Sequence, residues 1–115
     1  MLLTREAILA ASDLKRELVE VPEWGGELYI STMTGADRNN WEQSLVQGGG
    51  RVNLNNATAR LVAACAVDES GQRLFSDADA EALGKKSAAA LERCSKVAQR
   101  LNGLTSTELE QAKGN

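Results

Sequence analysis

The segment ELVEVPEWGGELYISTMT, residues 17–34, indicates the class of the fold. Apolar β-formers alternate with polar residues on both sides of a Gly-Gly pair, a pattern typical of two strands joined by a tight turn. Gly25 and Gly26 tolerate the positive φ angles that such a turn needs. The sequence therefore predicts a β-hairpin over residues 17–34.

A two-residue turn at Gly25 and Gly26 would fix the register of this hairpin. The predicted pairs are Val21–Ile30 and Val19–Thr32 on one face, and Pro22–Tyr29 and Leu18–Met33 on the other. Because an isolated hairpin is only marginally stable in water, one of these partly apolar faces should pack on helices, and the other could meet a partner. Pro22 has no N–H to donate, so its strand should be an edge strand at that point.

Helix signals lie on both sides of the hairpin. Before it, residues 4–11 (TREAILAA) place apolar side chains at helical spacing behind a capping Thr4, and we expect this short helix to cover an edge of the core. After it, three Ser/Thr-x-x-acid pairs resemble capping boxes, which mark helix starts. The pairs are Thr34 with Asp37, Ser76 with Asp79, and Thr105 with Glu108.

Hydrophobic periodicity extends these starts into helices. The predicted ranges are 35–46, 52–67, 77 to 83 or 84, 85–102 and 106–113. The first should bury Trp41 and Leu45 and should end at the triple glycine of residues 48–50. The second contains Arg60 as its one charged residue, so it should be the central and most buried helix.

These elements predict a mainly α protein with a small N-terminal β-hairpin, an α+β fold. We expect a compact helical bundle in a single domain over residues 1–115, with residues 35–113 as the helical region. A chain of 115 residues with 43% hydrophobic content suits one core. No apolar stretch approaches the roughly 20 residues that cross a bilayer, and no secretion leader is apparent. We therefore expect a soluble protein with reduced, buried Cys65 and Cys94.

The residue types present argue against an enzyme. The chain has no histidine, so its serines and cysteines lack the usual activating base. The acidic residues between Asp68 and Glu81 do not have the spacing of an EF-hand. A formal charge of −3 and a pI near 5.0 argue against broad nucleic-acid binding. We predict no catalytic, metal-binding or cofactor-binding residues, and a function based on protein–protein interaction.

One candidate binding surface lies on the helix predicted at 85–102. At 100° per residue its basic side chains fall within one arc beside an apolar face. The candidate partner-binding residues of this basic edge are Lys86, Arg93, Lys96 and Arg100, with Lys85 beside them. The edge is a solvated flank, a docking site for an acidic helix or a contact for nucleic-acid phosphates.

The hairpin supplies the other candidates, Trp24 and Tyr29. A tryptophan beside Gly-Gly could be exposed, as tryptophans at interfaces are, or could pack across the hairpin onto a helix. Trp41 lies within a predicted helix together with Leu45, so we expect it in the core.

Five segments carry a resemblance to a known family. They are VPEWGG (21–26), MTGADR (33–38), LFSDAD (74–79), LGKKS (83–87) and AQRLNGL (98–104). In this order they resemble the small tail assembly chaperones of long-tailed bacteriophages, and the likeness covers nearly the whole chain. Their motifs are structural, so the resemblance transfers no catalytic or binding residue.

This resemblance implies a non-enzymatic factor of siphovirus or prophage origin, made in the host cell cytoplasm and absent from the mature virion. Such chaperones are expected to bind the tape measure protein, keep it soluble and recruit major tail protein, and self-association is also expected. Many are made in two lengths through a ribosomal frameshift, and this chain would be the short form. The alternatives are a structural virion component, such as a head-tail connector or tail-completion subunit, and a small nucleic-acid-binding regulator.

Overall fold

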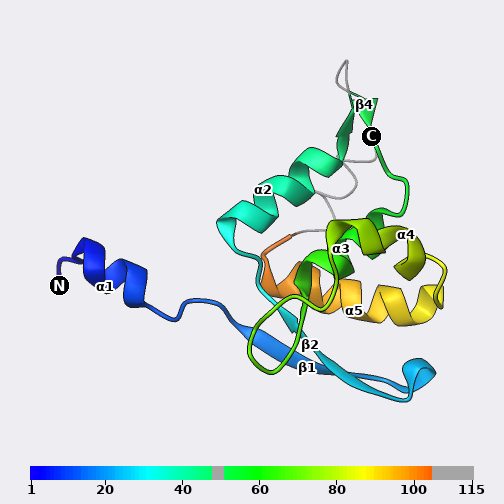
Figure 1. The fold of residues 1–115 in the computed structure, drawn as a ribbon, viewed down its shortest axis with the longest axis horizontal. Helices are drawn as coiled ribbons and strands as arrows, with labels where there is room; N and C mark the ends of the chain where they lie inside the picture. Colours follow the sequence, from blue (N-terminus) through cyan, green and yellow to red (C-terminus); the bar gives the residue numbers. More distant parts are fainter. Residues whose placement is uncertain (48–50, 105–115) are drawn as a thin grey trace.

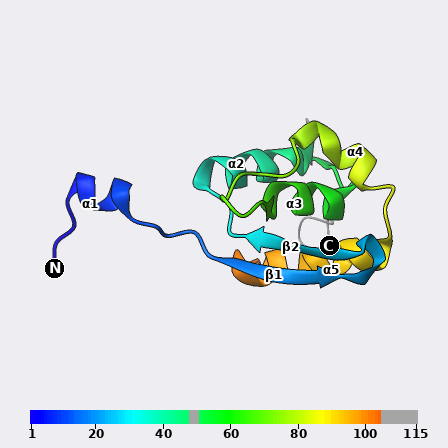
Figure 2. The ribbon, with the colours of Figure 1, turned by 60° about the horizontal axis from the view of Figure 1, so that its bottom comes forward.

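A small antiparallel sheet and the helices that cover it form the body of the molecule in the computed structural model, which describes residues 1–47 and 51–104 (Figure 1). The strands β1 (Arg16–Val21), β2 (Gly26–Ser31) and β5 (Ala66–Val67) lie in the order β1-β2-β5. The sheet packs against α3 (Ala57–Cys65) and α5 (Ala88–Leu101) (Figure 2). The α+β class is confirmed. The helical bundle is not, because the sheet forms part of the packed core.

The first two strands pair as predicted in direction but not in register. Val21 lies opposite Gly26 and Val19 opposite Leu28, so the partners are displaced by four residues from those predicted. Residues Pro22–Trp24 form a 3₁₀ turn in place of strand, and Gly25 has φ +73°. The connection is therefore longer than a two-residue turn, because proline favours the first position of a helical turn.

The shift of four residues is even, so it leaves the faces of the hairpin unchanged. Val19, Val21 and Ile30 are buried together on the inner face. Leu18 and Tyr29 pair on the outer face, and Leu18 is exposed. Alternation along a strand thus decided which side chains turn inward.

In its described part, the predicted helical region of residues 35–113 contains three short strands that the sequence pattern did not predict. Val46–Gln47 (β3) pairs with Arg51–Val52 (β4) on either side of residues 48–50. The predicted helix 52–67 is shorter at both ends, because α3 ends at Cys65 and Ala66–Val67 become β5 against β2. A short, fully apolar run has no period that separates strand from helix.

The predicted helix starts are largely confirmed. Helix α2 (Gly35–Ser44) begins after Thr34, whose hydroxyl accepts a hydrogen bond from the Asp37 N–H, and it buries Trp41. Ser76 and Asp79 form a capping box at the 3₁₀ turn Asp77–Asp79, which leads into α4 (Ala80–Leu83). The third pair, Thr105 with Glu108, and the helix predicted at 106–113 lie outside the described residues.

The long helix α5 begins three residues later than predicted. Residues 84–87 separate it from α4, and the Ser87 hydroxyl caps it by accepting from the Ala90 N–H at 3.3 Å. Gly103 has φ +67° after the last turn, as predicted for the C′ position of this helix.

The N-terminal helix α1 (Arg5–Ala10) forms as predicted, with Thr4 accepting from the Ala7 N–H. It does not cover the core. None of its residues is buried, and residues 1–14 project from the body as an arm (Figures 1 and 2). The prediction that this helix covers a core edge is therefore wrong.

The core is centred on α3 and includes all three strands of the sheet. Ile30, Val62 and Cys65 are almost completely enclosed, and both cysteines are buried and free. Burial raises the pKa of the Cys65 thiol to about 12 and raises that of Cys94. Both cysteines therefore remain uncharged thiols at neutral pH, as packed core residues do.

Candidate protein-binding surfaces

The basic residues predicted as one edge of α5 lie in two different environments. Arg93 donates two hydrogen bonds to the carboxylate of Glu23, at 2.6 and 3.0 Å. Arg100 donates to Glu17 Oε2 at 2.6 Å. Both arginines thus connect α5 to the hairpin, although their side chains remain partly exposed.

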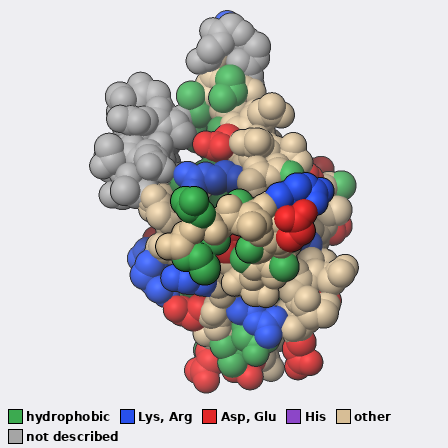
Figure 3. All heavy atoms as spheres, turned by 90° about the vertical axis from the view of Figure 1, so that its left-hand side faces the viewer, with side chains coloured by type: hydrophobic (Ala, Val, Ile, Leu, Met, Phe, Trp, Pro, Cys, Tyr) green, Lys and Arg blue, Asp and Glu red, His purple; other side chains and the backbone are tan. Residues whose placement is uncertain are grey.

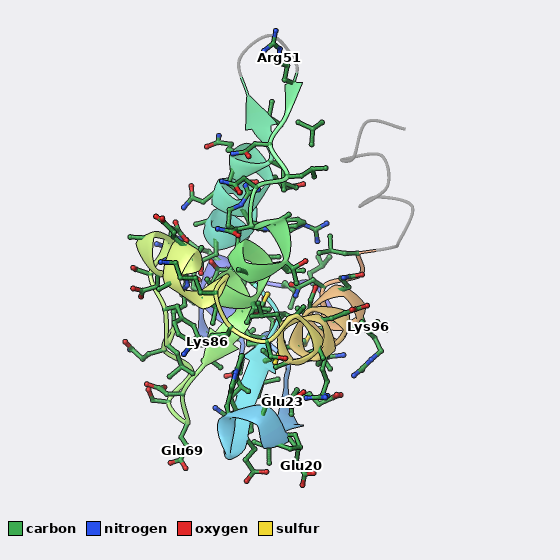
Figure 4. The ribbon with its side chains drawn as sticks, turned by 90° about the vertical axis from the view of Figure 1, so that its right-hand side faces the viewer. Glu20, Glu23, Arg51, Glu69, Lys86 and Lys96 are labelled. Atoms are coloured by element: carbon green, nitrogen blue, oxygen red, sulfur yellow. The ribbon has the colours of Figure 1, made fainter. Side chains whose placement is uncertain are left out.

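Lys86 and Lys96 lie beside a groove between α3 and α5 instead (Figure 4). This groove, named here the α3–α5 groove, has a volume of about 680 Å³. Its lining includes Trp41, Leu45, Leu61, Leu91, Lys86 and Lys96. The long C-terminal helix therefore has one side held to the sheet and another along an open groove.

The hairpin candidates are half-buried. Trp24 packs against the hydrophobic core from the turn between the strands, which favours packing over full exposure. The Arg16 guanidinium carbon lies 4.3 Å from the centre of the Tyr29 ring, a distance at which a cation and an aromatic face attract each other. The structure places these two residues on the hairpin, away from the α3–α5 groove.

Arg60 is a structural residue whose role the sequence did not reveal. Its guanidinium donates to the Ser44 carbonyl and hydroxyl oxygens and to the Asn53 carbonyl oxygen. These bonds fasten the end of α2 and the segment after β4 to α3. The signal available in the sequence was the single charge within an apolar helix.

Asp68, Asp77 and Asp79, three of the acidic residues between Asp68 and Glu81, are used within the fold. Asp68 accepts from the Ser70 hydroxyl and from the Ser70 and Gln72 N–H groups, and these bonds lower its pKa. Asp77 pairs with Arg73 at 2.9 Å. In residues 1–47 and 51–104, no three His, Cys, Asp or Glu side chains come together as a metal site would require.

Comparison with known proteins gives a family for the chain. A sequence model of phage tail assembly chaperones matches residues 3–114. The chain belongs to this family. The match confirms the resemblance carried by the hairpin and the C-terminal helices. No curated protein sequence matches the chain.

A solved structure shares the fold of this tail assembly chaperone. It is the tail assembly chaperone of bacteriophage HK97, with a TM-score of 0.58 and 19% sequence identity. The alignment covers 84% of this chain and 94% of the HK97 chain. At this identity the comparison establishes the fold and leaves the binding residues to be argued from the geometry.

The N-terminal arm of the chaperone exposes a second apolar surface. Leu2, Leu3, Ile8 and Leu9 each expose more than half of their surface. Figure 3 shows the molecule from the side on which the arm projects, with hydrophobic side chains exposed among charged ones.

Among the described residues, no helix has the length and hydropathy needed to span a membrane.

Proposed function

We propose that this protein is a non-enzymatic chaperone that binds the tape measure protein and keeps it soluble during tail assembly. It also recruits major tail protein, acts in the host cytoplasm and leaves the particle before the virion is complete. The observation that carries this proposal is the family match over residues 3–114.

The exposed surfaces are consistent with this function. A long helical client needs apolar surface to cover its own, and exposed apolar patches of some extent mark interaction sites. The arm offers such surface. At the α3–α5 groove, Leu54 exposes 40% of its surface. Several copies along one tape measure would bind tightly even if each contact were weak. The apolar arm also supports self-association, because its helix has no buried residue within its own chain.

Co-expression tests the proposal directly. The chain is expressed with the tape measure protein encoded in the same phage genome, and with an empty vector as control. We expect the tape measure protein to become soluble and to co-purify with the chain. If a folded chain produces neither effect, the proposal fails. Mass spectrometry of purified virions then tests the alternative, because a structural virion component would be found in the particles.

A further inference from the structure

The lining of the α3–α5 groove follows one stripe of α5. The α5 residues that line it include Ala88, Leu91, Ser95 and Gln99, at spacings of three or four that place them on one stripe of the helix. This stripe runs for about 17 Å at about 1.5 Å per residue. A helix laid in the groove would therefore pack beside α5 for about three turns, as helices pack ridges into grooves.

The composition of the groove suits close approach by an apolar helix face. Ala57, Ala88 and Ser95 are small residues of its lining, and small side chains let a partner backbone come near. Leu54, at the lip, is 40% exposed. Leu54 is therefore apolar surface at the groove that the described fold leaves uncovered.

The charges at the rim of the groove indicate which charges a partner helix would carry beside its apolar stripe. Among the described residues, Lys86 and Lys96 line the groove with one acidic residue, Glu92, whose Oε1 lies 3.5 Å from Lys96 Nζ. This local excess of positive charge contrasts with the formal charge of −3 of the whole chain. Arg93 and Arg100 are held by glutamates of the hairpin, so the lysines are the cations that face this groove.

We propose that the α3–α5 groove binds one amphipathic helix of the tape measure protein. The apolar stripe of that helix lies against the groove floor, and acidic side chains beside the stripe meet Lys86 and Lys96. The inference rests on the proposed function, and it adds the location of the site and the chemistry of the segment that the site selects.

Matched pairs of variants separate this groove from the rest of the surface. Ala88→Glu places a charge in the groove, while Ala89→Glu places the same charge on the next residue of α5, which is exposed and outside the lining. The double variant K86E/K96E reverses both rim lysines. Its control is the double variant R51E/K85E, which reverses two exposed positive charges outside the lining.

Each variant is co-expressed with the tagged tape measure protein, and the chaperone retained on the tag is quantified at low and high salt. We expect Ala88→Glu and K86E/K96E to reduce retention at least tenfold, and both controls to match the wild type. Circular dichroism melts check that each variant is folded. High salt should reduce the retention of the wild type more than that of K86E/K96E, because salt screens the attraction between the two lysines and acidic side chains. That attraction is absent from the variant.

The outcomes distinguish this inference from the proposed function. If the wild type retains nothing, the proposed function fails. If the wild type and the folded groove variants retain the tape measure protein equally, the function stands and the groove inference is overturned. If the folded groove variants still retain the tape measure protein but, measured alone by light scattering, have a smaller mass than the wild-type chaperone, a second copy of this chain occupies the groove in the wild type. The inference is then likewise overturned.

Discussion

Arg60 shows how a charged residue is accommodated in the most buried helix of the protein. Its guanidinium satisfies carbonyl groups at the end of α2 and after β4, and burial lowers its pKa. Hydrogen bonds from charged donors are stronger than neutral ones. The sequence indicated that α3 would be buried, but the acceptors of Arg60 lie 7 and 16 positions away and are brought together by the fold.

Leu61, the neighbour of Arg60, tests the predicted core. It is 2% exposed on α3, so Leu61→Ala should lower the free energy of unfolding by about 2 to 5 kcal/mol through lost burial and a residual cavity. Urea unfolding followed by circular dichroism measures this loss. Leu54→Ala is the matched control, because Leu54 is 40% exposed and should cost much less. Equal losses at the two positions would contradict the core described here.

Helix α1 shows that an element can form where predicted and still have a different role. Its cap and its helical spacing are local properties of residues 4–11, and both are present. Its position depends on the path of residues 11–14, which lead away from the body (Figure 1). A helix of six residues is marginal in water by itself, so a partner that covers its apolar residues would stabilise it.

Deletion of residues 1–10 tests whether the arm stabilises the body of the molecule. Because no residue of α1 is buried, we expect the shortened chain to keep its urea midpoint within experimental error at low protein concentration. The full-length chain, unfolded in parallel, is the reference. A clearly lower midpoint for the shortened chain would show that the arm stabilises the body, and a difference that grows with protein concentration would place that contact between copies.

Ion pairs join two large parts of the molecule, the hairpin and α5. Glu23 and Glu17 of the hairpin meet Arg93 and Arg100 of the helix across 70 and 83 sequence positions. Exposed pairs of this kind contribute little stability individually. Their effect at this scale is on orientation, because they hold one side of α5 to the sheet while the other side borders the groove.

The pair of Glu23 and Arg93 makes the stability of the molecule depend on pH. The hydrogen bond from Arg93 lowers the pKa of Glu23. A lowered pKa in the folded state stabilises the fold above the unfolded pKa of about 4.3, and this stabilisation is lost as the pH falls through the lower, folded value.

We therefore expect Glu23→Gln to lose less stability than the wild type between pH 5 and strongly acidic pH, measured as urea midpoints at each pH. Asp68, whose pKa is also lowered, remains in both proteins and contributes the same decline to each. Glu20→Gln is the control, because Glu20 is exposed on the same hairpin. Identical pH profiles for the Glu23→Gln variant and the wild type would contradict this prediction.

Local sequence determined the features of this protein that depend on neighbouring residues. These are the helix caps at Thr34 and Ser76, the inward face of the hairpin and the burial of Trp41. Each depends on contacts within a few positions or on the period of one element, so each can be predicted without knowing the fold. The order of the segments also sufficed to indicate the family, which the match over residues 3–114 confirms.

Tertiary structure alone decided the features that depend on distant partners. Ala66 and Val67 form a strand because they pair with the free edge of β2. The register of the hairpin is set by the turn that begins at Pro22. Helical spacing places Lys86, Arg93, Lys96 and Arg100 on one predicted edge. In the structure, the two arginines pair with glutamates of the hairpin, and the two lysines line the groove. Periodicity gives the face of a helix on which a side chain lies, but the surface opposite that face depends on how the elements pack.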